Sequence, residues 1–327
     1  MAPKSIPGEF SLIEEVRRIM KPASMKTDVI LGIGDDAAVV KGSGSRKLVL
    51  TVDALVEGIH FDPAYFDFES IGWKAMAVNL SDLAAMGAEP RWALVQLTLS
   101  SKQNLNQVKK LYKGILKASH RFGCEVVGGN TTLSKKEFSI SVTVIGESSG
   151  RVLTRGGAKT NDVIAVTGNL GASAAGQQLL MNKKGLKQYT TMKHLRPEPR
   201  LADIRRLMQA RVKVSACIDI SDGLSSELHH LGKASERGMV VDLDALPIHA
   251  ATRSASKSLR KDVMDLALHG GEEYELLMTL PPREFVKARR LLGNRITAIG
   301  VVTAQHGIFT SQHGDLQPLA ARGYVHF

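Results

Sequence analysis

The chain has 327 residues and a mass of 35.4 kDa, which predicts two domains of the usual ~150 residues. Hydrophobic residues make up 43% and charged residues 23%, so the composition excludes a disordered tail protein. Its two cysteines exclude a disulfide scaffold, and we expect Cys124 and Cys217 to be reduced. No apolar run reaches ~18 residues and no apolar signal-peptide core follows Met1, so we expect a cytoplasmic protein with no membrane partner.

The net charge of +11 raises the question of nucleic-acid binding. The cations are dispersed, with mild local excesses over residues 183–213 and 253–261. Only 5% of residues are aromatic, and no helix-turn-helix, zinc-finger or RNA-recognition motif is present. We therefore expect no nucleic-acid partner, since small phosphorylated ligands account for the charge equally well.

Short strand-like apolar runs alternate with longer helix-like runs, which is typical of an α/β protein. In the first half, helices are predicted over Glu9–Met20 (between Gly8 and Pro22), Ile71–Met86 and Leu105–Phe122. Strands are predicted over Val29–Ile33, Leu48–Val52, Arg91–Leu99, Glu125–Val127 and Phe138–Ile145.

A segment rich in glycine, serine and arginine, residues 146–157, predicts a boundary between domains 1–148 and 149–327. Beyond it, strands are predicted over Asp162–Thr167, Ser215–Asp219, Met239–Leu243, Tyr274–Leu280 and Ile296–Val302. Helices are predicted over Ala174–Met181, Arg200–Ala210, Ser225–Ala234 and Arg283–Leu292. No internal repeat of 20 to 50 residues is visible.

The segment Gly32–Ala37 nearly matches the dinucleotide fingerprint G-x-G-x-x-G/A after a strand. That fingerprint opens a helix, whereas Ala38-Val39-Val40 continues as a β-branched run. Asp35 and Asp36 would also repel a bare pyrophosphate unless a cation lay between them. The motif alone leaves two interpretations open: a metal-bridged polyphosphate site and a polar turn between strands.

Further aspartates stand where apolar segments end. Asp53 follows a predicted strand, Asp82 interrupts an apolar helix, and Asp219 and Asp222 flank Ile220-Ser221 after another strand. An aspartate on an apolar helix face is costly to bury unless it is paired or coordinated. Strand ends converge in the crevices of α/β proteins, and magnesium prefers oxygen ligands. Each aspartate alone could be a cap or a turn residue, but the group favours a magnesium-phosphate site.

Competing motifs are missing or out of context. The sequence has no P-loop, no protein-kinase set and no zinc motif. Gly146–Gly150 matches G-x-S-x-G, but an extended run follows it, so we interpret it as linker. In 269–275, twin glycines precede acidic residues, so either Glu272 contacts a ligand or the segment is a helix C-cap. His60 is likewise either a ligand contact or a structural histidine.

An ordered series of motifs runs from residue 8 almost to the C-terminus: Gly8–Ile13, Gly34–Ala38, Val56–Phe61, Lys74–Ala88, Leu153–Arg155, His194–Pro199 and Asp219–Leu224. This series resembles the thiamine-monophosphate kinase family. That family is part of an ATP-binding superfamily that also contains aminoimidazole ribonucleotide synthetase, selenophosphate synthetase and a hydrogenase-maturation protein.

The resemblance implies an α/β fold with mixed sheets, of the two-domain aminoimidazole ribonucleotide synthetase-like type, whose N-terminal sheet pairs across a homodimer. It implies ATP and several magnesium ions between the domains. The implied reaction is direct in-line phosphorylation of thiamine monophosphate to thiamine diphosphate, giving ADP.

The resemblance also implies roles for particular residues. The implied magnesium ligands are Asp36, Thr51, Asp53, Asp82, Asp219 and Asp222. The implied nucleotide contacts are Gly129, Arg155 and Ser221, and the implied thiamine monophosphate contacts are His60, Glu272 and Tyr324. The implied catalytic set is Asp36, Asp53, Asp82, Asp219, Asp222 and Arg155.

The chain departs from the family pattern at three positions. Asn130 replaces an aspartate at a metal and nucleotide position, and Glu273 replaces another aspartate. Val52 replaces a threonine, which leaves its backbone carbonyl as a metal ligand.

Two alternative functions follow: another enzyme of the superfamily, or a non-catalytic binder of nucleotide or thiamine phosphate because of Asn130. A selenophosphate synthetase would need a cysteine near the N-terminus, whereas the first cysteine is Cys124.

Overall fold

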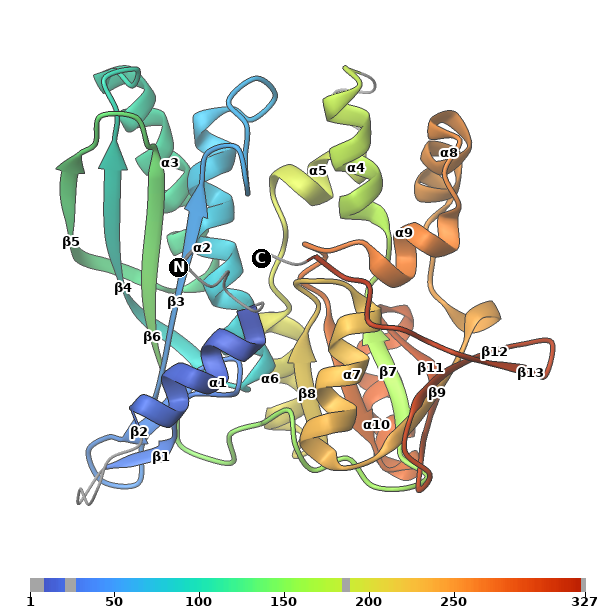
Figure 1. The fold of residues 1–327 in the computed structure, drawn as a ribbon. Helices are drawn as coiled ribbons and strands as arrows, with labels where there is room; N and C mark the ends of the chain where they lie inside the picture. The colour runs from blue at the N-terminus through green and yellow to red at the C-terminus, as the bar shows by residue number, and fades with distance from the viewer. Residues whose placement is uncertain (1–8, 21–27, 184–188, 325–327) are drawn as a thin grey trace, which may run out of the picture.

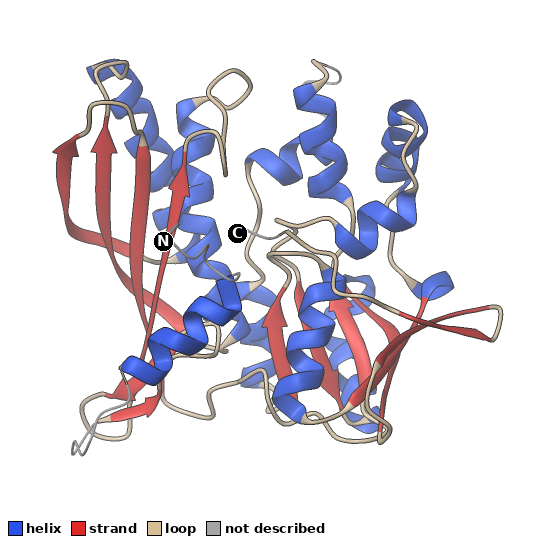
Figure 2. Cartoon of the chain, viewed as in Figure 1, coloured by secondary structure: helices blue, strands red, loops and turns tan. Residues whose placement is uncertain are grey.

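The computed structural model describes residues 9–20, 28–183 and 189–324, which form two β-sheets with helices packed on them (Figures 1 and 2). The first sheet contains β1 to β6 and the second contains β7 to β13. Both sheets mix parallel and antiparallel pairs, which confirms the predicted α/β class. Within the described ranges, no helix has the length and apolar character needed to cross a membrane.

The N-terminal sheet has six strands in the order β1-β2-β3-β6-β4-β5, and β4 and β5 pair in parallel. The strands are β1 Val29–Leu31, β2 Ala38–Lys41, β3 Lys47–Val56, β4 Glu89–Leu99, β5 Glu125–Leu133 and β6 Ser139–Ser148. Helices α2 (Phe68–Ala85) and α3 (Leu105–Phe122) cover one face, and α1 (Glu9–Ile19) precedes the sheet (Figure 1). In β6, buried Ile140, Val142 and Val144 alternate with less buried residues, which gives the sheet one covered and one open face.

Helices α2 and α3 pack closely because a glycine of each faces the backbone of the other. A Cβ atom at Gly72 would collide with the carbonyl oxygen of Leu111, and one at Gly114 would collide with that of Glu69. Most of α2 is buried, since this helix also contacts β3, β6 and β8. As a result α2 touches both sheets.

The C-terminal sheet has seven strands in the order β13-β12-β9-β11-β7-β10-β8. The strands are β7 Val163–Thr167, β8 Ala216–Asp219, β9 Gly238–Asp242, β10 Leu276–Leu280, β11 Ile296–Thr303, β12 Ile308–Gln312 and β13 Asp315–Pro318. The helices are α4 Ala172–Met181, α5 Tyr189–Leu195, α6 Leu201–Gln209, α7 Leu224–Ser235, α8 Ala250–Leu259, α9 Val263–His269 and α10 Pro282–Leu292. Two short 3-10 turns, Leu243–Ala245 and Gly293–Arg295, complete the described elements. Helix α7 lies in front of this sheet, with α6 and α10 behind it (Figure 1).

The structure differs from the sequence prediction in several elements. Strand β5 continues from Val127 to Leu133 because its polar residues pair with β4, and pairing rather than apolar alternation makes them a strand. Residues 146–148, interpreted as linker, belong to β6, where Gly146 pairs with Val49. The prediction missed the helices α5, α8 and α9 and the strands β2, β12 and β13 as elements. Gly8 and Pro22, the predicted limits of the first helix, lie outside the described residues.

Candidate active site

A cleft of about 1170 Å³ is lined by residues from both halves of the chain. Its walls come from the start of β2, from β3 and α2, from the loops after β8 and α9, and from the C-terminal segment. All predicted site residues except Gly129 and Asn130 line it: Asp36, Thr51, Val52, Asp53, His60, Asp82, Arg155, Asp219, Ser221, Asp222, Glu272 and Tyr324. The tertiary structure thus gathers residues that are dispersed over most of the sequence.

Three carboxylates meet in the cleft. Asp36 lies in the bend before β2, Asp82 in the last turn of α2 and Asp219 at the end of β8. One carboxylate oxygen from each lies within 4.8 Å of the others. Buried, mutually repelling carboxylates are stable only when protons, cations or donors offset their charge.

The pKa values of these carboxyl groups record this repulsion. Burial is the largest cause of the raised pKa of Asp36, which is about 7, and Asp219 adds to it against the opposing charge of Arg155. Burial also raises the pKa of Asp219 to about 6, with a smaller contribution from Asp53. The pKa of Asp82 lies well above its usual range because of burial and its acidic neighbours. A bound divalent cation would remove the need for these protons.

The donor set of the cluster fits magnesium. Its ligand atoms are carboxylate oxygens, the type that magnesium prefers. Among the described residues, Asp36 Oδ2 is buried and has no hydrogen-bond partner. A buried carboxylate oxygen without a hydrogen-bond partner is free to coordinate a metal ion.

Side chains of α2 and β3 orient the cluster. Thr51 Oγ1 donates to Asp82 Oδ2 at 2.5 Å, and Ser81 Oγ donates to Asp219 Oδ2 at 2.6 Å. The backbone N–H of Asp53 donates to Asn79 Oδ1 at 3.0 Å. Asn79 and Ser81 had no predicted role, because nothing in their spacing shows which strand end they face.

Arg155 forms the cationic side of the cluster. Its Nε and Nη2 donate to Asp36 Oδ1 at 2.9 and 2.5 Å. Its backbone N–H points at the carboxylate of Asp35, with N···O distances of 3.2 and 3.3 Å. Arg155 therefore holds the Gly-Asp bend before β2 in place from the other half of the chain. Asp35 was recognised in the motif but had no assigned role.

The loop after β8 brings Ser221 and Asp222 to the cleft. The backbone N–H of Asp222 donates to Glu227 Oε1 at 2.9 Å. Gly223 follows at φ 124°, where a Cβ atom would lie 2.9 Å from the backbone of His269. The backbone N–H of Tyr324 donates to Asp222 O at 3.0 Å, which ties the C-terminal segment to the same loop.

His60, Glu272 and Tyr324 line the cleft from three separate segments. His60 follows β3, Glu272 follows α9, and Tyr324 lies after β13 with 49% of its surface exposed. Burial opposes ionisation of Glu272, but Lys74 and His194 outweigh it and lower the pKa of this carboxyl to about 2. Glu272 is therefore a carboxylate at neutral pH and can face a cationic ligand.

Gly129 and Asn130 lie elsewhere in the described chain. Both lie on the edge strand β5, where they pair with Val95 and Gln96 of β4. Strands β4 and β6 separate β5 from β3. Three strand spacings of about 4.8 Å put them roughly 14 Å from β3. Gly129 and Asn130 therefore do not line the cleft of their own chain.

The cleft also contains cationic and polar residues that the sequence analysis did not single out. These are Arg17, Gln177, His230, Lys233 and Arg322. Burial, followed by Arg155, lowers the pKa of His230 to about 4. Isolated polar and basic residues of this kind have no distinctive spacing in the sequence, so no pattern could have found them.

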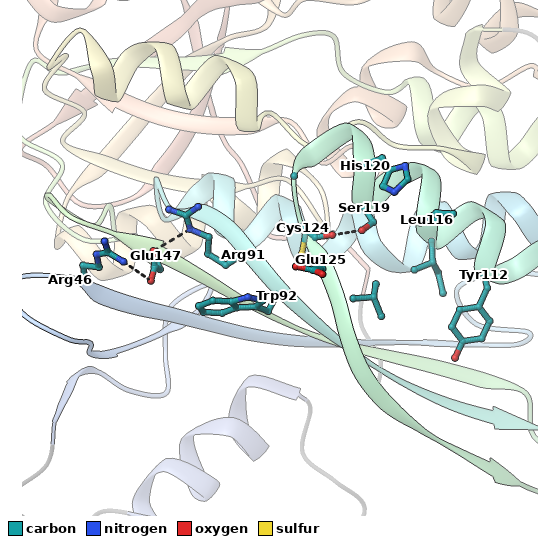
Figure 3. A pocket seen from close by; sticks show the side chains of 13 residues that line it. Arg46, Arg91, Trp92, Tyr112, Leu116, Ser119, His120, Cys124, Glu125 and Glu147 are labelled. Carbon is teal, nitrogen blue, oxygen red and sulfur yellow. Dashed lines mark hydrogen bonds and ion pairs between the residues drawn. The ribbon is translucent and has the colours of Figure 1, made fainter.

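A second groove, of about 1020 Å³, lies where α3 meets the beginning of β5 (Figure 3). Trp92, Tyr112 and Leu116 line it, and Glu147 pairs with Arg46 and Arg91 at one end (Figure 3). The carboxylate cluster found in the described residues is not in this groove. The cleft is therefore the candidate active site.

Comparison with known proteins identifies the family of the chain. The family model of the AIR synthase related protein N-terminal domain matches residues 34–148, and that of the C-terminal domain matches residues 159–311. The thiamine-monophosphate kinase of Aquifex aeolicus (strain VF5) is 35% identical over 326 residues, with 98% of each chain covered. That of Escherichia coli (strain K12) is 37% identical over 329 residues, again covering 98% of each chain.

A solved structure of AaThiL complexed with AMPPCP and TMP superposes with a TM-score of 0.86 at 33% sequence identity. The match covers 98% of this chain and 97% of that chain. The predicted two-domain aminoimidazole ribonucleotide synthetase-like fold is thereby confirmed. The chain belongs to the AIR synthase related proteins and, within them, to the thiamine-monophosphate kinase family.

Proposed function

We propose that this protein transfers the terminal phosphoryl group of ATP to the phosphate of thiamine monophosphate, giving thiamine diphosphate and ADP. One observation carries the proposal: a single cleft contains the carboxylate cluster of Asp36, Asp82 and Asp219 together with Arg155 and the predicted acceptor contacts. The relative solved with AMPPCP and TMP has the same fold along nearly its whole length. We place the reaction in the cytoplasm, which supplies ATP.

Asp36, Asp53, Asp82, Asp219 and Asp222 would hold magnesium, with the hydroxyl of Thr51 and the carbonyl of Val52 as further oxygen ligands. Bound magnesium offsets the negative charge of the two phosphate groups that must approach each other. Arg155 is proposed to donate to the transferring phosphoryl group, and Ser221 to contact the nucleotide. The acceptor phosphate is ionised at neutral pH, so the protein needs no general base.

His60, Glu272 and Tyr324 are proposed to bind thiamine monophosphate. The thiazolium ring is a cation, which suits the ionised carboxylate of Glu272 and the π face of Tyr324. These three residues lie on different segments, so their roles depend on the cleft rather than on one motif.

We also propose a homodimer formed through the open face of the N-terminal sheet. Val52, Leu94 and Trp92 are 61%, 42% and 39% exposed on this face, and β5 is an edge strand with a second strand on only one side. A long exposed edge beside an apolar face favours association with another chain. Asn130 pairs with Gln96 of β4. Because side chains alternate along a strand, Gln96 lies on the same open face as Leu94 and Trp92, and so does Asn130. Gly129 and Asn130 are therefore proposed to serve the cleft of the partner copy.

A direct assay tests the proposed reaction. The purified protein is incubated with magnesium, ATP and thiamine monophosphate, and thiamine diphosphate is quantified over time. An Asp219→Asn protein prepared in the same way is the control, because a contaminating kinase would give equal product in both. We expect product from the wild type alone. Binding of both ligands by calorimetry without product would instead identify the non-catalytic binder that Asn130 suggests.

A further inference from the structure

Lys74 is a buried cation in the central helix α2. Its side chain has no exposed surface, and it is the only basic residue among the 18 residues of this helix. A buried ammonium group is costly unless it is paired and its donors are satisfied. The contacts that offset this cost therefore indicate the role of Lys74.

Two of these contacts reach the residues proposed to bind the acceptor. Lys74 Nζ lies 2.6 Å from Glu272 Oε1 and donates to the carbonyl oxygen of His60 at 2.8 Å. The ammonium also lies 5.2 Å from the ring centroid of Phe66. One side chain thus joins the loop after β3 in the N-terminal half to the loop after α9 in the C-terminal half.

Glu272 is held on both carboxylate oxygens and on its backbone. His194 Nδ1 lies 3.2 Å from Oε2, and the backbone N–H donates to Ser221 O at 2.6 Å. Its φ of 61° is in the left-handed region, which a glutamate adopts only when its surroundings fix it. Its side chain is nevertheless 22% exposed and lines the cleft. The carboxylate is therefore immobilised from behind while one side faces the ligand.

His60 is fixed in the same way. Its Nδ1 accepts from the backbone N–H of Val56 at 3.1 Å, so the proton of the neutral ring lies on Nε2. Its carbonyl accepts from Lys74. Both the ring and the backbone of His60 are thus held in one orientation at the cleft wall.

We propose that Lys74 is a positioning residue of the acceptor site, which sets the relative placement of Glu272 and His60 across the two halves of the chain. Lys74 has no exposed surface and does not line the cleft, so its role is to position other residues rather than to bind the substrate. This inference rests on the proposed reaction, because it assigns Glu272 and His60 to thiamine monophosphate.

The test compares Lys74→Met, Glu272→Gln and the double variant in steady-state assays that vary each substrate separately. We expect Lys74→Met to raise KM for thiamine monophosphate at least 10-fold while KM for ATP changes less than 2-fold. Lys117→Met is the matched control, since Lys117 forms a surface ion pair with Glu69 at 2.5 Å outside the cleft. That control should leave both KM values unchanged.

The double variant keeps the inference falsifiable if Lys74→Met alone does not fold. Once Glu272 has lost its charge, only the hydrogen bond to the His60 carbonyl remains for Lys74 to contribute, so the double variant should lie within about 3-fold of Glu272→Gln in KM for thiamine monophosphate. A further 10-fold rise, or an equal rise in both KM values for Lys74→Met, overturns the positioning role. Wild-type protein without product in the same assay would overturn the proposed reaction instead, so the two failures are distinct.

Discussion

At the level of single residues, the candidate site contains buried charged groups. The free-energy cost of burying each charge is offset by an opposite charge nearby or by a bound ligand. Asp36, Asp82 and Asp219 have raised pKa values because burial and mutual repulsion disfavour their ionised forms. Without a bound cation, the folded protein is therefore less stable when these groups are ionised than when they are protonated. Strain of this kind is typical of sites that acquire a cation or a substrate.

Asp82→Asn separates function from stability. The amide keeps the shape and can still accept from Thr51 Oγ1, but it removes one of the repelling charges. We expect kcat to fall by about 10² or more, as for the loss of comparable electrostatic groups. Without magnesium, the midpoint of urea unfolding at pH 7 should rise. Near-native turnover would show that Asp82 is a structural residue only.

Tyr324→Ala addresses the acceptor end of the cleft. If the ring faces the thiazolium cation, KM for thiamine monophosphate should rise several-fold with little change in KM for ATP. Tyr324→Phe keeps the π face and serves as the control, with an expected KM close to that of the wild type. Equal effects on both substrates, or none, would contradict the assignment.

Glu273 provides a pH-dependent contribution to stability away from the carboxylate cluster. Burial is the main cause that raises its pKa to about 8, against the opposing charge of Lys193. The folded chain holds this proton up to about pH 8, whereas the unfolded chain releases it near 4.5. Between these values the unfolded chain binds fewer protons, so stability falls as the pH rises.

Glu273→Gln mimics the protonated form and can still accept the 2.9 Å hydrogen bond from the Ser173 N–H. We expect the variant to lose less stability than the wild type between pH 5 and pH 8, measured by urea unfolding at both values. Glu125→Gln, at an exposed position, should follow the wild type. A variant with the wild-type pH dependence would show that Glu273 is ionised throughout.

At the scale of elements, α2 organises the cleft. Lys74, Asn79, Ser81 and Asp82 of this one helix contact the loop after α9, β3 and β8. By contrast, β5 carries Gly129 and Asn130 at the far edge of the same sheet. The proposed dimer is the arrangement in which this edge reaches a cleft.

Complementation between two inactive variants tests the role of β5. Asn130→Lys places a cation at the proposed metal position, and Asp219→Asn removes a carboxylate, so each protein alone should be inactive. After unfolding and refolding as a mixture, a cleft with Asp219 can meet a partner β5 with Asn130. Random pairing gives half mixed dimers with one intact site of two, so we expect roughly a quarter of the wild-type rate. No recovery, with dimers verified by sedimentation, would place Asn130 in its own cleft, and an Asn130→Lys protein that is active by itself would place Asn130 outside catalysis.

At the scale of the whole molecule, the cleft is built from both sheets, and ligand binding should stabilise the chain as a whole. AMPPCP with magnesium at about 100 times its Kd should contribute about 2.7 kcal/mol to the free energy of unfolding. For a chain of this length that corresponds to a rise in Tm of about 4 °C by calorimetry. Asp219→Asn should show a smaller rise. A shift of the same size in that variant would locate the nucleotide elsewhere.

The division of the chain also belongs to this scale. The first sheet ends with β6 at Ser148 and the second begins with β7 at Val163. We propose domains 1–148 and 149–327, with the α2 contacts to β8 and α6 joining them.

Features that depend on near neighbours could be predicted from the amino-acid pattern. The predicted helix Leu105–Phe122 is observed with the same limits, because Asn104 and Gln107 form a capping box and Gly123 ends the helix at φ 70°. The motifs likewise identified Asp36, Asp82 and Asp219 as candidates, since acidic residues in a Gly-Asp motif or next to an apolar segment stand out in a sequence. Periodicity and capping act over a few residues, and a linear pattern can record them.

Which of these residues meet depends on the packing of the whole chain. Lys74 reads as one cation in an apolar helix, and its pairing with Glu272 depends on how the two halves of the chain dock. Asn130 belongs to the same family motif set as Asp219, yet strand order places it across the sheet from the carboxylate cluster. Contacts between distant segments follow from the packing of whole elements, and packing is a property of the assembled core rather than of any local stretch of sequence.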